Sequence, residues 1–120
     1  MNDESIVRRP GCLLFTFHSS HARINPMIIG TCAIELHLEG NGSLKGKRAA
    51  LKPLLTRLHK EFNLSAAEID RHDQWQNATI ALACVANDRA QVEHVLNSAV
   101  HWIEHHRPDW QVVDWEIEMI

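Results

Sequence analysis

The sequence lacks the features that mark several common classes of protein. Its three cysteines form neither an even disulfide framework nor a Cys-x-x-Cys pair, which excludes a disulfide miniprotein and a zinc ribbon. No apolar run approaches the ~20 residues that a membrane-spanning helix needs, so no membrane is expected as a partner. Acidic residues outnumber basic ones by 15 to 12, which excludes a histone-like basic protein. What remains is a chain of 120 residues, 45% of them hydrophobic, the size of one folded domain.

The sequence also lacks the motifs that would indicate catalysis. It contains no Gly-rich phosphate loop, no Ser/His/Asp order and no Cys/His dyad. Of its nine histidines, His101 and His105 have the i, i+4 spacing that can chelate a metal. No cysteine or carboxylate completes a zincin-like motif around them. We therefore expect no enzyme, no catalytic residue, no metal site and no cofactor.

The first residues of the chain differ from the rest. Residues 1–26 show no useful helical or strand periodicity. Arg8 and Arg9 precede only a short, mostly apolar stretch, which is too short for the core of an export signal. We expect residues 1–26 to be an N-terminal extension that is disordered or lies upstream of a true start at Met27. The protein is expected to be cytoplasmic.

From Met27 onward, regular hydrophobic spacing predicts six elements of secondary structure. Strict alternation indicates strands, and apolar residues three and four positions apart indicate helices. The predicted elements are a strand at 27–38, a helix at 44–62, strands at 64–70 and 78–86, a helix at 89–106 and a strand at 113–119. Ser43 and Asp88 are expected to cap the two helices. Pro53 is expected to kink the first helix, because it removes one backbone hydrogen bond.

The order of these elements predicts the fold. Two βαβ units with right-handed crossovers give a ferredoxin-like α+β sandwich, βαββαβ, over a single domain at 27–120. Its four-stranded antiparallel sheet would have the order 4-1-3-2, with both helices on one face. The other face is expected to carry acidic side chains and one histidine around Ala81 and Ala83, namely Glu35, His37, Glu68, Asp70, Asp114, Glu116 and Glu118. This face lacks aromatic residues, unlike the sheet of an RNA-recognition motif.

Several stretches resemble the YlxP-like family of small bacterial proteins. They are MIIGTCAIELHLEGNGSLKGKR, FNLSAAEIDRHDQWQ, VANDRAQVEHVL and DWEIEMI, and the resemblance covers residues 27–120. The most specific matches are Ser43-Leu44-Lys45 with Lys47-Arg48, and Glu68, Asp70, Asp73, Trp75 and Gln76. Gly46, Arg71-His72 and Gln74 depart from the family's pattern, so no role is carried over to them. The resemblance implies a domain of unknown function with a ferredoxin-like fold. Genes of the family often lie beside those for translation initiation factor two and ribosome-binding factor A, which implies a link to ribosome assembly or translation.

The predicted first helix contains an unusual concentration of positive charge. Between residues 44 and 60 there are six basic residues and no acid. Such a face can neutralise phosphates and bind RNA without sequence preference. We predict that phosphate is contacted by Lys45, Lys47, Arg48 and Lys52. The alternative is an ordinary solvated helix face.

The connection after the second strand is another candidate site. Asp70, Asp73, Trp75 and Gln76 place hydrogen-bonding groups beside a flat apolar ring. One interpretation is a recognition loop built from these residues. The other is a packed structural loop in which Trp75 covers the sheet edge and its indole N–H is paired.

These features lead to one preferred function and two alternatives. The preferred function is a non-catalytic accessory protein associated with ribosomal RNA or ribosomal particles through the basic helix. The first alternative is a homodimeric ligand-binding or regulatory module that uses the open face of the sheet. The second is a small enzyme that uses carboxylates on that face.

Overall fold

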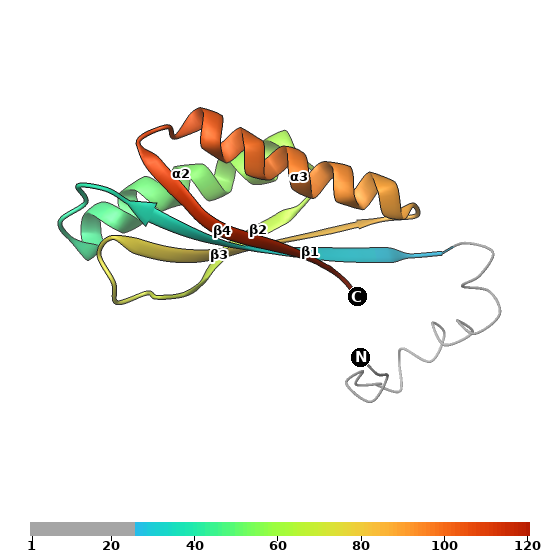
Figure 1. Cartoon of the computed structure of the whole chain (residues 1–120), viewed down its shortest axis with the longest axis horizontal. Coiled ribbons are helices and arrows are strands. Elements are labelled where there is room, and N and C mark those ends of the chain that lie inside the picture. Colours follow the sequence, from blue (N-terminus) through green and yellow to red (C-terminus); the bar gives the residue numbers. More distant parts are fainter. Residues whose placement is uncertain (1–25) are drawn as a thin grey trace.

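The computed structural model describes residues 26–120. Six elements follow one another along this part of the chain (Figure 1): β1 (Ile28–Leu38), α2 (Leu44–Glu61), β2 (Ser65–Asp70), β3 (Asn77–Ala86), α3 (Arg89–His106) and β4 (Trp110–Met119). The order and nature of all six agree with the prediction. The predicted extension at 1–26 lies outside the described residues except for Pro26.

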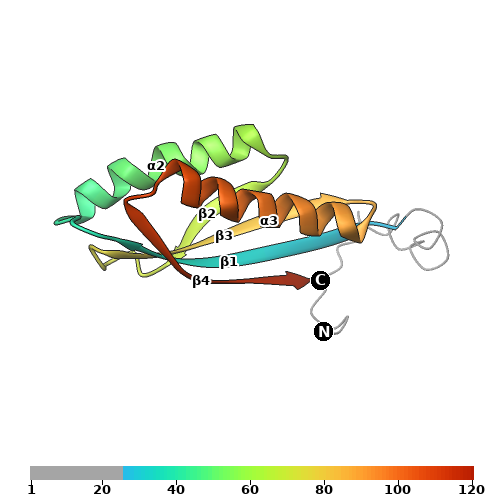
Figure 2. The ribbon, with the colours of Figure 1, turned by 45° about the horizontal axis from the view of Figure 1, so that its top comes forward.

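The four strands form one antiparallel sheet in the order β2-β3-β1-β4. Both helices lie on the same face of this sheet, and the other face is open (Figures 1 and 2). The strand order is the predicted 4-1-3-2 read from the opposite edge, so the ferredoxin-like α+β fold is confirmed. None of the helices between residues 26 and 120 is long and apolar enough to cross a membrane.

The core lies between the helices and the inner face of the sheet. Strand β1 contributes every second residue to it, and the helices contribute one apolar stripe each. The buried side chains include Cys32, Ile34, Leu36 and Leu38 of β1, Leu51, Leu54 and Leu58 of α2, and Val92, Leu96, Val100 and Ile103 of α3. Burial raises the pKa of the Cys32 thiol to about 11 and also raises that of Cys84. Both thiols are therefore protonated and unreactive at neutral pH.

The helix starts are capped as the sequence predicts. The Ser43 hydroxyl accepts a hydrogen bond from the Gly46 backbone N–H at 2.9 Å. The Asp88 carboxylate accepts one from the Gln91 backbone N–H at 3.2 Å. Helix α2 continues without a break through the exposed Pro53, so the loss of one backbone hydrogen bond does not end the helix.

The predicted open face needs one correction, at Glu68. In β2, Glu68 pairs with Ile80, a core residue of β3, and its side chain is only 15% exposed on the helix side of the sheet. A bulge between Glu68 and Asp70 then sets Asp70 opposite Thr79. Strict alternation had placed Glu68 and Asp70 on the same face, and the extra residue in the bulge breaks that relation.

A second bulge changes the predicted start of β4. The pairing register between β1 and β4 shifts between Glu35 and Leu36, whose partners in β4 are Asp114 and Val112. Val113 is the extra residue and is 57% exposed, whereas Trp110 at the new start of the strand is buried. The strand is therefore three residues longer than the alternation alone predicted.

Candidate nucleic-acid interface

Lys47 is not a surface cation, contrary to the sequence-based expectation. Its side chain is 1% exposed, and its ammonium lies 2.9 Å from a carboxylate oxygen of Glu68. The same ammonium donates hydrogen bonds to the backbone oxygens of Arg71 at 2.6 Å and Asn77 at 3.0 Å. Two backbone carbonyls and one carboxylate thus surround the ammonium, and such pairing is the condition under which a buried charge is tolerated. Lys47 therefore does not belong to the predicted phosphate-contacting group.

The hydrogen bonds of Lys47 hold the connection between β2 and β3 against helix α2. We call residues 71–76 the tryptophan loop. Arg71 adopts a positive φ of 61°, a conformation that costs energy for a residue other than glycine. The surroundings hold it there, because the Arg71 side chain donates to Glu35 at 3.0 Å and to Thr79 at 3.2 Å. Asp70 accepts from the Arg71 backbone N–H at 2.7 Å, so Asp70 shapes the loop from within.

The other end of the tryptophan loop is fixed just as closely. The backbone N–H of Leu38 donates to the Gln76 carbonyl at 2.7 Å. The Asn77 side chain donates to Gln74 at 3.1 Å and lies within hydrogen-bond distance of His37, also at 3.1 Å. Side chains and backbone from β1, β3 and α2 thus anchor a loop that has no regular structure of its own.

The turn between β1 and α2 joins the tryptophan loop to the start of the basic helix. The Asn41 amide donates to the Trp75 carbonyl at 2.6 Å and to the Ser43 carbonyl at 2.8 Å. A side chain at Gly46 would bring a Cβ within 2.8 Å of the Asn41 side-chain oxygen. Glycine at this position therefore leaves room for the bridge between helix and loop.

Trp75 is exposed at the tip of this anchored loop. Its side chain is 55% exposed, so it does not cover the sheet edge as the structural interpretation expected. Asp73, Gln74, Trp75, Gln76 and Asn77 line an open hollow of about 520 Å³. The described contacts hold the backbone of the loop and leave the indole ring available, as the recognition-loop interpretation requires.

Three of the four predicted helix cations remain on the surface. We call Lys45, Arg48 and Lys52, which are all exposed, the basic strip. Arg48 and Lys52 line a groove of about 250 Å³ above β2, whose other lining includes Leu55 and Glu68. The first turn of α2 contains no acidic residue, so the positive end of the helix dipole adds to this charge.

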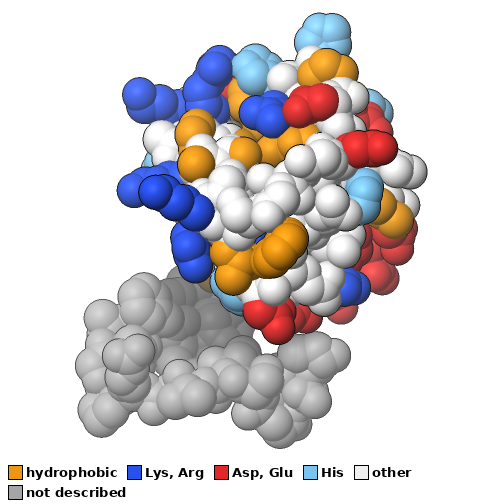
Figure 3. Space-filling model, turned by 90° about the vertical axis from the view of Figure 1, so that its left-hand side faces the viewer, with side chains coloured by type: hydrophobic (Ala, Val, Ile, Leu, Met, Phe, Trp, Pro, Cys, Tyr) orange, Lys and Arg blue, Asp and Glu red, His pale blue; other side chains and the backbone are white. Residues whose placement is uncertain are grey.

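The structure brings the two predicted sites to the same end of the molecule. The first turn of α2, which carries Lys45, and the tryptophan loop meet through Asn41 and Lys47. Seen from this end, Lys and Arg side chains gather along one side and Asp and Glu along the other (Figure 3). Sequence reasoning missed the scaffold residues Asn41 and Arg71. A signal for Lys47 was present, because it lies four and seven positions before the buried Leu51 and Leu54.

The open face of the sheet offers no comparable site. Glu35 faces Asp114 across the strands, but it is ion-paired with Arg71 at 3.0 Å. The carboxylates of Glu116 and Glu118 stand opposite Ala33 and Thr31. Within residues 26–120, no group of three or more His, Cys, Asp or Glu side chains is placed to hold a metal ion.

Comparison with known proteins gives the family of the chain. A family model described as "Protein of unknown function (DUF503)" matches residues 29–117. The uncharacterized protein YlxP of Bacillus subtilis (strain 168) is 39% identical over 77 residues, which are 64% of this chain and 84% of that protein. The de novo designed protein Foldit4 is a similar solved structure, with a TM-score of 0.47 and 13% identity, over 78% of this chain and 96% of that one. A C-terminal segment of the alpha subunit of aIF2 from Pyrococcus abyssi gives a TM-score of 0.46 and 17% identity, over 79% of this chain and 50% of that one. The chain therefore belongs to the family of proteins of unknown function DUF503, in agreement with its resemblance to the YlxP-like proteins.

Proposed function

We propose that this protein is a non-catalytic accessory factor of the cytoplasm that binds RNA, free or within ribosomal particles, at the end of the fold where the tryptophan loop meets helix α2. The observation that carries the proposal is the 55% exposure of Trp75 on a loop whose backbone is fixed by hydrogen bonds. An aromatic side chain on a backbone that is already fixed requires little further ordering of the loop when a base stacks on it.

The basic strip supplies the second part of an RNA interface. Lysine and arginine side chains neutralise phosphates and release their counterions, which gives affinity that falls as salt rises. Lys45 and Arg48 extend from the first turns of α2, next to the turn that Asn41 ties to the Trp75 carbonyl. A single strand that stacks one base on Trp75 would thus meet cations on the α2 side of the loop.

The acidic residues of the protein favour one direction of approach. Asp114, Glu116 and Glu118 alternate along β4 on the open face, and Asp73 lies beside Trp75. These carboxylates would repel a phosphate backbone that crossed the sheet. We therefore place the RNA backbone along α2 and away from the open face.

Ribosome-profile fractionation with matched charge reversals tests the proposal. The test variant is Lys45→Glu with Arg48→Glu, and the control is Lys60→Glu with Arg89→Glu, which changes the net charge equally at the far end of the helices. The native protein and the control should co-sediment with ribosomal particles at low salt and dissociate as salt rises. The test variant should stay in the light fractions.

Two results would contradict the proposal. One is native protein that never co-sediments with particles and binds no single-stranded RNA at low salt. The other is equal co-sedimentation of the test variant and the control. In that case the basic strip does not carry the contact.

A further inference from the structure

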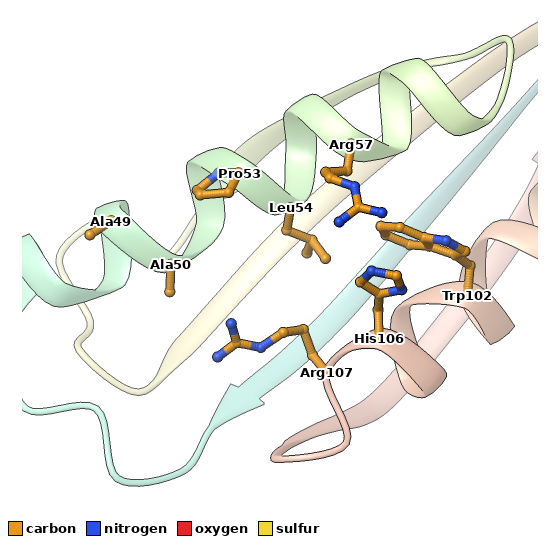
Figure 4. A pocket seen from close by; sticks show the side chains of 8 residues that line it. All are labelled: Ala49, Ala50, Pro53, Leu54, Arg57, Trp102, His106 and Arg107. Carbon is orange, nitrogen blue, oxygen red and sulfur yellow. The ribbon is translucent and has the colours of Figure 1, made fainter.

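A second hollow lies on the other flank of α2, between the two helices (Figure 4). Its volume is about 260 Å³, small for a ligand pocket and suited to a compact ligand. On the α2 side it is bounded by the small residues Ala49 and Ala50 and by Pro53. These residues leave open a space that larger side chains at a helix–helix contact would fill.

The walls of this hollow are basic. Arg57 comes from α2, His106 ends α3, and Arg107 follows it; no carboxylate lines the space. Arg57 and Arg107 approach from opposite sides, as Figure 4 shows. Three donor side chains around a space that no carboxylate lines attract an oxyanion.

Aromatic rings hold these three side chains in place. The Arg57 guanidinium lies 5.6 Å from the centre of the Trp102 ring, and the His106 ring stacks on Trp102 at 4.1 Å. The Arg107 guanidinium lies 4.1 Å from the centre of Trp110. Stacking uses the face of a guanidinium and leaves its N–H groups free to donate within the plane.

Few of these donors are used inside the described part of the chain. Glu61 lies 3.9 Å from Arg57, beyond hydrogen-bond distance, and both side chains are about half exposed. Asp109 accepts from one terminal nitrogen of Arg107 at 2.9 Å, while the Arg107 Nε is buried with no hydrogen-bond partner. An unpaired buried donor is uncommon and calls for an acceptor.

We infer that this hollow binds a small phosphate monoester or inorganic phosphate, held between Arg57, His106 and Arg107. The number of donors favours this ligand, because a phosphate monoester presents three terminal oxygens. A carboxylate presents two, and so does each internal phosphodiester of an RNA strand. The site is separate from the proposed RNA interface, since the basic strip and Trp75 do not line it.

The four tryptophans allow a direct test in the whole protein. Their indole N–H signals in a ¹H–¹⁵N spectrum report separately on the tryptophan loop (Trp75), the hollow (Trp102), the ring against Arg107 (Trp110) and the middle of β4 (Trp115). Titration with inorganic phosphate or methyl phosphate should shift the Trp102 signal saturably at constant ionic strength. Dimethyl phosphate, a diester, should bind about tenfold more weakly or worse.

Variants separate a specific site from general charge. Arg57→Gln and Arg107→Gln should each weaken phosphate binding about tenfold or more, while Lys45→Gln should not change it. Ala50→Leu fills the hollow without altering charge and should abolish binding, with an unchanged spectrum elsewhere showing that the fold is intact.

Three outcomes would overturn the inference. The first is no saturable shift of Trp102 with either inorganic phosphate or methyl phosphate. The second is an equal response to dimethyl phosphate or chloride. The third is a Trp102 shift with a single-stranded RNA oligonucleotide and none with phosphate, which would make the hollow part of an RNA surface. Loss of RNA binding at Trp75 would leave this inference untouched, so the two proposals fail separately.

Discussion

Helix α2 has cations on both its inner and its outer side, and the cations of the two sides differ in what they contact. On the inner side, Lys47 is 1% exposed, ion-paired with Glu68 and hydrogen-bonded to two backbone carbonyls. On the outer side, Lys45, Arg48 and Lys52 are exposed. Lys47 and Arg48 are adjacent in the sequence but lie on different sides of the helix. Lys47 therefore holds the structure, whereas Arg48 is free to meet a partner.

This difference shows that the basic segment is not one functional unit. The inner cation determines where the tryptophan loop sits, because its ammonium binds the carbonyls of Arg71, the first residue of that loop, and of Asn77, the residue that follows it. The outer cations determine what approaches it. Net charge alone would count the four residues equally, whereas burial divides them into a structural group and a binding group.

The largest expected effect comes from breaking the inner contact. Lys47→Met removes the ammonium and leaves the Glu68 carboxylate, which is 15% exposed, without its partner. Removing one member of a buried ion pair costs about 3–5 kcal/mol, and we expect about 3 kcal/mol because Glu68 keeps some contact with water. Urea denaturation measures this change in the free energy of unfolding.

A double substitution gives the control for this prediction. Lys47→Met combined with Glu68→Leu removes both charges and should recover much of the lost stability, because no carboxylate is then left unpaired. If the double variant is no more stable than Lys47→Met alone, the cost lies in the lost carbonyl contacts and not in the stranded charge.

The next effect sharpens the role of the outer side, where Trp75 and the basic strip act together. Trp75→Ala should weaken binding of single-stranded RNA by about 1–3 kcal/mol, the value of one stacked base. The free energy of unfolding should change little, because the ring is 55% exposed. Fluorescence anisotropy with a labelled oligonucleotide measures the affinity.

The matched variants for Trp75 are Trp75→Phe and Trp115→Ala. Phenylalanine keeps a stacking face and should retain most of the affinity. Trp115 lies on β4, away from the tryptophan loop, and its loss should leave RNA binding unchanged. Equal loss in Trp75→Ala and Trp115→Ala would mean that the exposed indole has no special role.

A smaller effect tests the link between the two sides. Asn41→Ala removes the hydrogen bonds from its amide to the carbonyls of Trp75 and Ser43, at a cost of about 1 kcal/mol. The backbone N–H of Gln74 donates to the Arg71 carbonyl at 3.0 Å, and its hydrogen should then exchange with solvent faster. In the control, Asn97→Ala removes one side-chain contact on the surface of α3 and should leave that exchange rate unchanged.

The sequence predicted the fold well because the fold depends on local spacing. Alternation in β1, the apolar run of β3, helical spacing in α2 and α3, and the caps at Ser43 and Asp88 are all visible within a few residues. The strand order then followed from right-handed crossovers. The bulges in β2 and β4 were not predictable from alternation, since each depends on the register of a neighbouring strand.

The candidate site was predicted in its parts and not in its assembly. The sequence pointed to Trp75 and to the cations of α2, but nothing local shows whether a tryptophan ring is covered. The partner of Lys47 also depends on tertiary contacts, because Glu68 faces the helices only through its pairing with Ile80. The helical spacing between Lys47 and the buried leucines indicated that Lys47 lies on the inner side of α2. The positive charge of Lys47 nevertheless favoured an exposed position in the prediction.

The smallest expected effect completes the comparison at the residue next to Lys47. Arg48→Ala should change the free energy of unfolding by no more than about 0.5 kcal/mol, because an exposed side chain away from buried contacts contributes little. It should still remove one phosphate contact and lower the slope of log affinity against log salt by about 0.7 for a single strand. Anisotropy titrations at several salt concentrations measure this slope. A loss of stability as large as that of Lys47→Met, with an unchanged slope, would show that the outer side of α2 is structural as well.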